Sequence, residues 1–256
     1  MWKIRKKEIN KQSHTKEGNK RKDYLHAAWW NNKRGQNQLG KNTGDSLALM
    51  LSKHDIDIIG LSESNILKDD DKGTTKIKGY DTINDNIFKL GKSRSSIYVR
   101  SGLKCKIRYD LMEEDTPEVW LEMTLGRSKT KCEDILYCQY YREQSELCGN
   151  KSRLGSDTIK KLEERLTTWM EKVATQILME NKRIYIGGDF NASIGVNGEH
   201  ADRLGASLEE TLMCEAGLDM LVDEPTHQEV KNGMLCKART IDHIYTNSPE
   251  KTSKTS

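Results

Sequence analysis

The sequence predicts an α/β protein in which a mixed sheet, or a pair of sheets, is covered by helices. Three observations favour this class. Short strand-like runs recur along the chain, long helical patterns lie among them, and several apolar runs end directly before an acid or an amide. Open α/β sheets place their chemistry at the C-terminal ends of their strands. The polar residues that follow the strands are therefore the first candidates for a functional site.

Several of the strand-like runs alternate apolar and polar residues, as half-buried strands do. The runs cover residues 25–30, 56–61, 96–100, 103–109, 119–125, 135–141, 184–187 and 241–245. Ser101-Gly102 separates two of these runs and predicts a tight hairpin.

Helical patterns occur in three places. Residues 157–181 carry an apolar stripe at spacings of three or four, which predicts a long helix packed on the core. A second helix is expected to begin at Ser207, where Glu210 completes a capping box, and to end at Gly217. A shorter helix over residues 45–53 is expected to lead into the next strand.

Composition predicts one folded domain with flexible ends. The chain has 256 residues, of which 35% are hydrophobic and 32% charged, which suits a modest core with polar loops. Residues 1–22 hold nine Lys or Arg against two Glu, so residues 1–23 are expected to form a basic, disordered arm. Such an arm either contacts phosphates or only keeps the terminus soluble. The domain is expected over residues 24–250, with a disordered tail at 251–256.

The six cysteines form no CxxC pair and no Cys/His cluster at zinc spacing. Nothing resembles a signal peptide, and no apolar run approaches about 18 residues. We therefore expect an intracellular protein, nuclear or cytoplasmic, that is neither secreted nor bound to a membrane.

The most informative segment is residues 184–191, where a short apolar strand is followed by Gly187, Gly188, Asp189 and Asn191. Residues i and i+2 of an extended segment point to the same side, so Asp189 and Asn191 are expected to project together. The two glycines let backbone or ligand approach closely. An acid and an amide in this position predict a metal-dependent phosphodiester site that needs further polar partners.

Further polar residues, which follow strand-like runs or lie on one, fit such a site. Carboxylate oxygens are good Mg²⁺ ligands, and phenol and guanidinium groups bind phosphate oxygens. An Asp near the C-terminus orients a histidine or a metal-bound water. Taken singly, each of these residues is equally typical of a solvated surface. They are Asn31 or Asn32, Glu63, Tyr141-Arg142 and Asp242.

In this order and context, the motifs resemble the endonuclease/exonuclease/phosphatase superfamily. Within it they are similar to the endonuclease domains of non-LTR (LINE-like) retrotransposons. The resemblance covers roughly residues 24–250. The resemblance rests on the motifs Trp30-Asn31, Ile59-Gly60-Leu61-Ser62-Glu63, Tyr140-Tyr141-Arg142-Glu143, Gly188-Asp189-Phe190-Asn191 and Ile241-Asp242-His243-Ile244-Tyr245-Thr246-Asn247.

The resemblance implies a four-layer α/β sandwich, in which two packed mixed sheets carry helices outside and the active site at one end. It also implies hydrolysis of DNA phosphodiesters with Mg²⁺ or Mn²⁺. Asn31 and Glu63 would hold the metal, and Tyr141 would contact the scissile phosphate. Asp189 would position or deprotonate the attacking water, and Asn191 would orient the phosphate or the nucleophile.

The same resemblance implies the remaining roles and partners. Asp242 would act as the orienting acid of the penultimate strand. Arg94, Arg100 and Arg142 would contact DNA phosphates. The protein is expected to be a monomer, and the full-length element would add a reverse transcriptase domain.

The chain departs from the family pattern at two points. Lys33 stands where relatives carry an acid or an amide, and no Ser-Asp-His follows Asp242. Either Asp242-His243 is itself the catalytic pair, or the last strand with its histidine is missing. The second interpretation is favoured, because adjacent strand residues point to opposite faces and His243 then faces away from the site. The domain would be truncated, and its activity is left open.

Two other functions remain as alternatives. One is a phosphoesterase of the same superfamily that acts on a small-molecule or lipid phosphate. The other is an inert nucleic-acid-binding or non-functional fragment, which the missing Ser-Asp-His favours.

Overall fold

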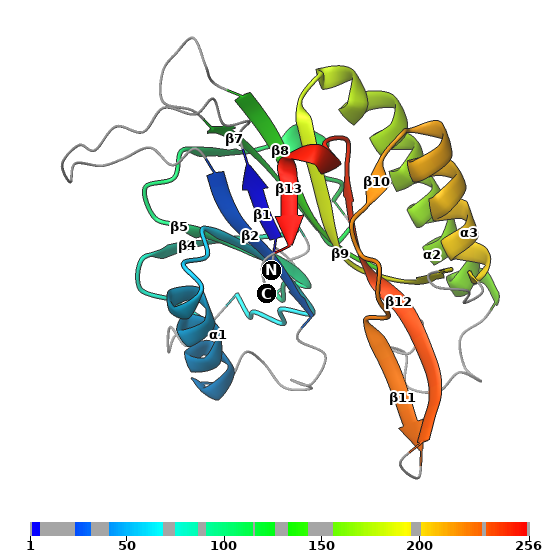
Figure 1. Ribbon diagram of the computed structural model, residues 1–256, viewed down its shortest axis with the longest axis horizontal. Helices are drawn as coiled ribbons and strands as arrows, with labels where there is room; N and C mark the ends of the chain where they lie inside the picture. Colours follow the sequence, from blue (N-terminus) through cyan, green and yellow to red (C-terminus); the bar gives the residue numbers. More distant parts are fainter. Residues whose placement is uncertain are drawn as a thin grey trace.

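The computed structural model describes residues 2–5, 24–31, 41–68, 75–86, 91–114, 116–125, 133–142, 156–195, 201–231 and 234–254. Over these residues the chain forms two packed β-sheets with helices on their outer sides (Figure 1). The predicted α/β sandwich is confirmed. None of the helices in the described ranges is long and apolar enough to cross a membrane.

The first sheet has six strands in the order β13-β1-β2-β3-β5-β4. They are β1 (Trp2–Arg5), β2 (Tyr24–Asn31), β3 (Ile58–Ser62), β4 (Tyr80–Asn84), β5 (Ser95–Arg100) and β13 (Thr252–Lys254). Strands β2 and β3 are parallel, and their register pairs Asn31 with Ser62 at the C-terminal ends. Two of the residues that follow predicted strands therefore lie side by side.

The second sheet runs in the order β10-β12-β9-β8-β7-β6, and β11 pairs with β12 outside this path. The strands are β6 (Cys105–Ile107), β7 (Glu118–Leu125), β8 (Glu133–Tyr141), β9 (Arg183–Ile194), β10 (Asp219–Met220), β11 (His227–Lys231) and β12 (Met234–Thr246). Strand β8 is parallel to β9, and β12 is antiparallel to it. This register places Tyr141 and Asp242 on either side of Asp189.

Three buried clusters separate the four layers. The cluster between the sheets joins residues such as Leu25 and Ile97 to Tyr137 and Tyr185. Helix α1 (Lys41–Lys53) packs on the outer face of the first sheet through its own cluster. Helices α2 (Ser156–Lys172) and α3 (Arg203–Leu208) cover the second sheet, where Trp169 is fully buried.

The long helix forms as predicted. Helix α2 continues through η4 (Val173–Ile177) and η5 (Leu178–Glu180), so helical structure extends over residues 156–180. Leu166, Trp169 and Val173 of the apolar stripe are fully buried. Burial of this face against the second sheet stabilises the helix more than its intrinsic propensity does.

The third helix begins earlier than its capping box predicts. Helix α3 starts at Arg203, and the side chain of Asp202 caps it by accepting a hydrogen bond from the Gly205 backbone N–H. Ser207 lies inside the helix, where its hydroxyl donates to the Arg203 carbonyl. The helical segment continues through η6 (Glu209–Glu215), and Gly217 follows it with a φ of 65°. The predicted start was wrong, and the predicted end is confirmed.

The turn at Ser101-Gly102 is present, but it does not form a hairpin. Gly102 has a φ of 92°, which favours glycine. The strand before the turn, β5, belongs to the first sheet, whereas β6 pairs with β7 in the second. The turn therefore carries the chain from one sheet to the other, a distinction that a local sequence signal does not contain.

The ends of the chain differ from the disordered segments that we expected. Trp2–Arg5 form β1, which pairs with Tyr24–Ala27, and Thr252–Lys254 form β13 beside it. The expectation of disorder was therefore wrong for these two segments, while residues 6–23 lie outside the described residues. Arg5 is the register partner of Tyr24, so it lies at the end of β2 farthest from Asn31.

Candidate functional site

The two sheets bring the strand-end residues together at one edge of the sandwich. In the second sheet, Tyr141, Asp189 and Asp242 occupy neighbouring register positions on β8, β9 and β12. In the first sheet, Asn31 and Ser62 are register partners on β2 and β3. The polar row of one sheet therefore faces the polar row of the other.

Asn31 joins the two rows directly. Its Nδ2 donates to Asp189 Oδ2 at 2.6 Å and to Asp242 Oδ1 at 3.2 Å. Asp189 is fully buried, whereas Asp242 is partly exposed. The structure thus gathers three of the predicted site residues through one shared amide, although Asn31 lies more than 150 positions from Asp189 in the chain.

The oxygen of this amide is suited to a cation. Asn31 Oδ1 is buried and has no hydrogen-bond partner among the described residues. A buried acceptor without a donor is costly, and a hard divalent cation satisfies such an oxygen. No group of three His, Cys, Asp or Glu side chains with metal-binding geometry occurs in the described ranges. An amide and a carboxylate still fit Mg²⁺, which keeps several of its waters.

Glu63 and Tyr141 complete a polar cluster with Asn31, Asp189 and Asp242, which is called the cluster below. Tyr141 Oη donates to Glu63 Oε1 at 3.4 Å, and Tyr141 is itself buried. Glu63 has a φ of 52°, a conformation that non-glycine residues rarely adopt. Strained backbone of this kind concentrates at functional sites, where the surrounding fold enforces it.

Arg94 lies behind Tyr141 rather than on the surface. Its side chain donates to the Tyr141 hydroxyl at 3.5 Å and to Asn65 Oδ1 at 2.9 Å. The guanidinium carbon lies 5.3 Å from the centroid of the Tyr141 ring. Arg94 is only 8% exposed, so it is a fixed positive charge within the cluster.

Asn191 takes a different position from the one its spacing suggests. Its φ of 48° takes the backbone out of the extended conformation directly after Asp189. The Asn191 backbone N–H donates to Asp189 Oδ1, while its side-chain amide donates to the Arg142 carbonyl at 2.6 Å. Arg142 in turn donates from Nη1 to the Asn191 carbonyl, and burial lowers the pKa of its guanidinium. The side chains of Asp189 and Asn191 therefore do not project together as an i, i+2 pair.

His243 lies on the opposite face of β12 from the cluster. Its ring is fully buried and stacks on Phe190, with ring centroids 4.9 Å apart. One ring nitrogen pairs with the Thr240 carbonyl and the other with the Tyr245 hydroxyl, both at 3.0 Å. Burial lowers the pKa of His243 to about 4. The imidazole is therefore part of the core beneath the site.

The paired glycines accommodate parts of the protein itself. A Cβ on Gly187 would lie 2.1 Å from the indole Nε1 of Trp29, which crosses from the first sheet. A Cβ on Gly188 would lie 1.8 Å from the Tyr140 carbonyl oxygen, and the φ of Gly188 is 150°. Gly187 therefore lets the two sheets approach each other beneath Asp189, whereas Gly188 lets β9 lie close to the backbone of β8 in the same sheet.

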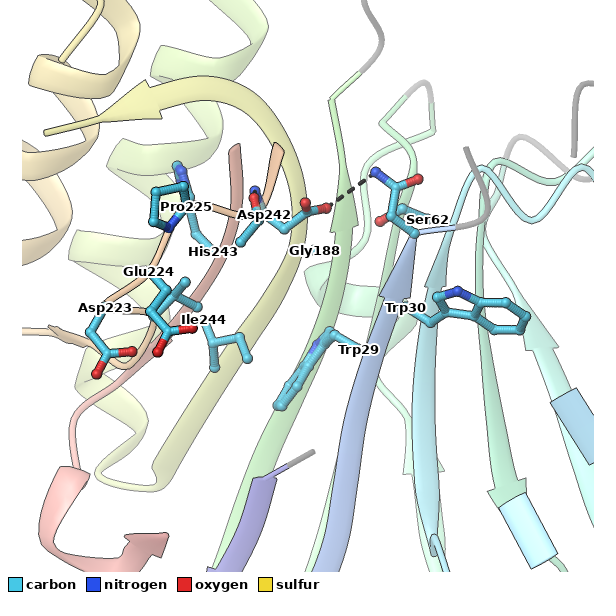
Figure 2. A pocket seen from close by; sticks show the side chains of 13 residues that line it. Trp29, Trp30, Ser62, Gly188, Asp223, Glu224, Pro225, Asp242, His243 and Ile244 are labelled. Atoms are coloured by element: carbon cyan, nitrogen blue, oxygen red, sulfur yellow. Dashed lines mark hydrogen bonds between the residues drawn. The ribbon is translucent and has the colours of Figure 1, made fainter. Parts of the chain in front are cut away.

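A cleft of about 430 Å³ opens beside the cluster. Figure 2 shows it between Trp29 on β2 and Ile244 on β12, with Asp242 at one end and Asp223 and Glu224 near its rim. Asp223 and Glu224 are exposed. The cleft gives a bound molecule access to the bridged acids.

Two hydroxyl groups that we did not predict hold the backbone of the acids. Ser62 Oγ accepts from the Asp189 backbone N–H at 3.1 Å, and Thr226 Oγ1 accepts from the Asp242 backbone N–H at 3.0 Å. Ser62 precedes Glu63 in a motif already singled out, so it had a local signal. Thr226 had none, because its role depends on the fold of the segment before β11.

Arg100 is the predicted site residue that the structure does not bring to the cluster. It pairs with Asp55 and Asp57 at 2.7 and 2.9 Å. The register of β3 and β5 puts Arg100 at the Ile58 end, whereas the cluster lies at the Ser62 end. Asn32 and Lys33 lie outside the described residues.

Comparison with known proteins identifies the fold. No protein-family model matches the chain, and no curated protein matches it. The endonuclease domain of TRAS1, a telomere-specific non-LTR retrotransposon, is 17% identical, with 88% of this chain and 86% of that domain covered and a TM-score of 0.56. The Xenopus laevis APE2 catalytic domain is 14% identical, with 88% and 82% covered and a TM-score of 0.60.

A third solved structure has the same architecture. An AP endonuclease from Archaeoglobus fulgidus is 12% identical, with 89% of this chain and 88% of that protein covered and a TM-score of 0.55. At these identities the likeness concerns the fold. The chain has the fold of the endonuclease/exonuclease/phosphatase superfamily.

Proposed function

We propose that this protein is a divalent-metal-dependent phosphodiesterase that acts on DNA in the manner of a retrotransposon endonuclease. The observation that carries the proposal is the bridge from Asn31 to both Asp189 and Asp242, with Glu63 and Tyr141 beside it. Acids held together at the mouth of a cleft suit hydrolysis of a phosphate ester better than a purely structural role.

The metal side of the site would be formed by Glu63 and by Asn31 Oδ1, the buried oxygen without a partner among the described residues. A bound Mg²⁺ or Mn²⁺ would neutralise charge that develops on the phosphoryl oxygens. The Asn31 amide cannot turn freely, because its Nδ2 is held by the two acids. The metal-facing oxygen is therefore oriented before any ligand arrives.

The protein's own groups would move the proton and hold the phosphate. Asp189 would take a proton from the attacking water, since its carboxylate is fixed by hydrogen bonds from Asn31 and from the Asn191 backbone. Tyr141 would donate a hydrogen bond from its hydroxyl group to a phosphate oxygen. Arg94, behind it, would stabilise the negative charge on the phosphate. Asp242 would orient the amide through which the two acids are linked.

DNA is the proposed substrate for two reasons. The similar structures include an endonuclease domain of a retrotransposon and an AP endonuclease. The cluster also contains two arginines, Arg94 and Arg142, that suit phosphate groups. We propose a monomeric, nuclear or cytoplasmic protein that works beside a reverse transcriptase domain, with Arg100 as a more distant phosphate contact.

A second candidate is binding of nucleic acid without efficient cleavage. The burial of His243 favours it, because that imidazole stacks on Phe190 in the core and is not available to a phosphate. The two candidates share the binding surface and differ only in turnover.

Nicking of supercoiled plasmid tests the proposal. We expect nicking with Mg²⁺ or Mn²⁺ that stops with EDTA and falls by about 10²- to 10⁴-fold in Asp189→Ala, the range for loss of a general base. Asp134→Ala is the matched control, because Asp134 is an exposed acid at the other end of β8. It should nick at the rate of the unmodified protein.

The same preparation separates the alternatives. Folded protein that binds plasmid in a gel shift but does not nick it with either metal would establish the second candidate and overturn the first. Release of phosphate from phosphoinositides or nucleotides, without plasmid nicking, would identify a small-molecule or lipid phosphoesterase.

A further inference from the structure

Gln139 is a fully buried amide directly beneath the candidate site. It lies on β8 between Tyr137 and Tyr141, and residues at this spacing on a strand share one face. Tyr137 packs in the cluster between the two sheets, so this face of β8 is the inner one. A polar side chain at such a position is unusual, because the surrounding positions are filled by apolar and aromatic groups.

The amide links the second sheet to the first through Ser62. Gln139 Nε2 donates to Ser62 Oγ at 2.8 Å and to the Tyr140 carbonyl at 3.1 Å. The same Ser62 oxygen accepts from the Asp189 backbone N–H at 3.1 Å. A short chain of hydrogen bonds therefore runs from Gln139 through Ser62 to the backbone of the proposed general base.

Glycines on both sheets make room for this amide. A Cβ on Gly60 of β3 would lie 2.1 Å from Gln139 Oε1, and a Cβ on Gly188 of β9 would lie 3.1 Å from Gln139 Nε2. The side chain therefore fills the space that these glycines leave between the sheets. Figure 2 shows Ser62 and Gly188 close together at the upper end of the two sheets, next to Asp242.

A contribution to stability alone does not account for the Gln139 amide at this position. Gln139 Oε1 is buried without a hydrogen-bond partner among the described residues. Such an oxygen destabilises the folded state, whereas an apolar side chain of similar length would fill the same space without that cost. The donated hydrogen bond to Ser62 is what the amide provides and an apolar side chain does not.

We propose that Gln139 is a positioning residue, which fixes the backbone of Asp189 through Ser62 and so holds the Asp189 carboxylate against Asn31. Its catalytic consequence rests on the proposed function, but its geometric consequence does not. In the absence of Gln139, the Ser62 hydroxyl is free to rotate, and the Asp189 N–H loses a fixed acceptor. The carboxylate then samples more than one orientation.

The first test needs no activity. Gln139→Met keeps the length of the side chain and removes its polar atoms. We expect an unchanged or higher melting temperature, together with amide hydrogen exchange at Asp189 that is about tenfold faster, the effect of about one hydrogen bond. The Asp242 amide is the internal control, because Thr226 holds it independently of Gln139. Unchanged exchange at Asp189 would overturn the proposal.

The second test uses turnover. Gln139→Met and Ser62→Ala should each lower kcat by about tenfold with little change in KM, and the double variant should lose no more than either single one. Gln176→Met is the matched control, because Gln176 is an exposed glutamine on the outer helix and should keep full activity. Additive losses in the double variant would show that the two residues act separately, and would overturn the chain of hydrogen bonds.

The two tests also separate this inference from the proposed function. If no form of the protein nicks DNA while Gln139→Met still exchanges faster at Asp189, the proposed function fails and the positioning role holds. If the unmodified protein nicks DNA and Gln139→Met matches it in both exchange and kcat, the positioning role fails and the proposed function holds.

Discussion

Two carboxylates of the second sheet, Glu118 and Asp189, are both fully buried, yet the fold surrounds them differently. Glu118 begins β7, packed under helix α2, and Asp189 lies on β9 next to Gly188, which lines the cleft. A buried carboxylate is unfavourable unless it is paired and hydrogen-bonded. The groups that face each acid therefore indicate what it is for.

Glu118 is satisfied inside the fold. Its Oε2 accepts from the indoles of Trp120 and Trp169, both at 2.7 Å. Its Oε1 accepts from Lys172 Nζ at 2.8 Å and from the Glu113 backbone N–H at 2.9 Å. The lysine supplies the opposite charge, so this acid needs nothing from outside the protein.

Asp189 is held by an amide that it shares with a second acid. Asn31 donates to both Asp189 and Asp242, and Glu63 lies nearby through Tyr141. The two acids therefore meet at one amide, beside the cleft that Asn31 and Asp242 line. Burial alone therefore does not mark a functional acid, whereas a neutral donor shared by two acids beside a cleft does.

Glu118→Ala should cause the largest loss of stability. Removing the acid leaves Lys172 and two indole N–H groups without their acceptor in the core, which we expect to lower the free energy of unfolding by about 3–5 kcal/mol. Urea denaturation measures it. Asp189→Ala in the same assay should cost much less, because it removes one of several clustered acids. Equal losses for both variants would contradict the distinction between an acid that serves the fold and an acid that serves the site.

The difference between the two acids also explains what the sequence reveals. Asn31 and Asp189 each follow an apolar run, and Asp242 lies on a strand-like run near the C-terminus, so a local rule finds them. The partners of Glu118 lie 51 and 54 positions away on a helix, and no local pattern pairs them. No local pattern points to Gln139 either, because its contact with Ser62 exists only when the two sheets face each other.

Charge alone does not place Arg100 or the first residues of the chain, because their partners are set by the fold. Arg100 is paired with two acids at the far end of the first sheet. Trp2–Arg5 join that sheet as β1, because an edge of β2 is open to receive them. Both outcomes depend on which elements are neighbours in the fold.

His243 lies on the core side of β12, beneath the same cluster, and its protonation should affect stability. Its folded pKa is about 4, below the ordinary value of 6.5, because burial disfavours the charged ring. The neutral ring is stabilising above pH 6.5. As the pH falls from 6.5 to 4, the unfolded chain binds a proton that the folded chain does not, so about 3 kcal/mol is lost.

Denaturation at a series of pH values measures this loss. His243→Phe keeps a ring that stacks on Phe190 and removes the titrating group, so its free energy of unfolding should depend less on pH between 6.5 and 4. The carboxylates contribute equally to the pH dependence of both proteins. The difference between the two curves therefore isolates the contribution of His243. Identical slopes would mean that the ring is not buried as a neutral group.

The smallest expected effect is at Asp242. Asp242→Asn removes one of the two negative charges that share the Asn31 amide, so the free energy of unfolding without metal should rise by about 1 kcal/mol or less. The same change should weaken the stabilisation that Mg²⁺ gives, because the cation then offsets less repulsion. Thermal unfolding with EDTA and with Mg²⁺ measures both. A variant that loses stability in EDTA would place Asp242 with Glu118, as an acid that serves the fold, and would leave Asp189 and Glu63 as the acids of the site.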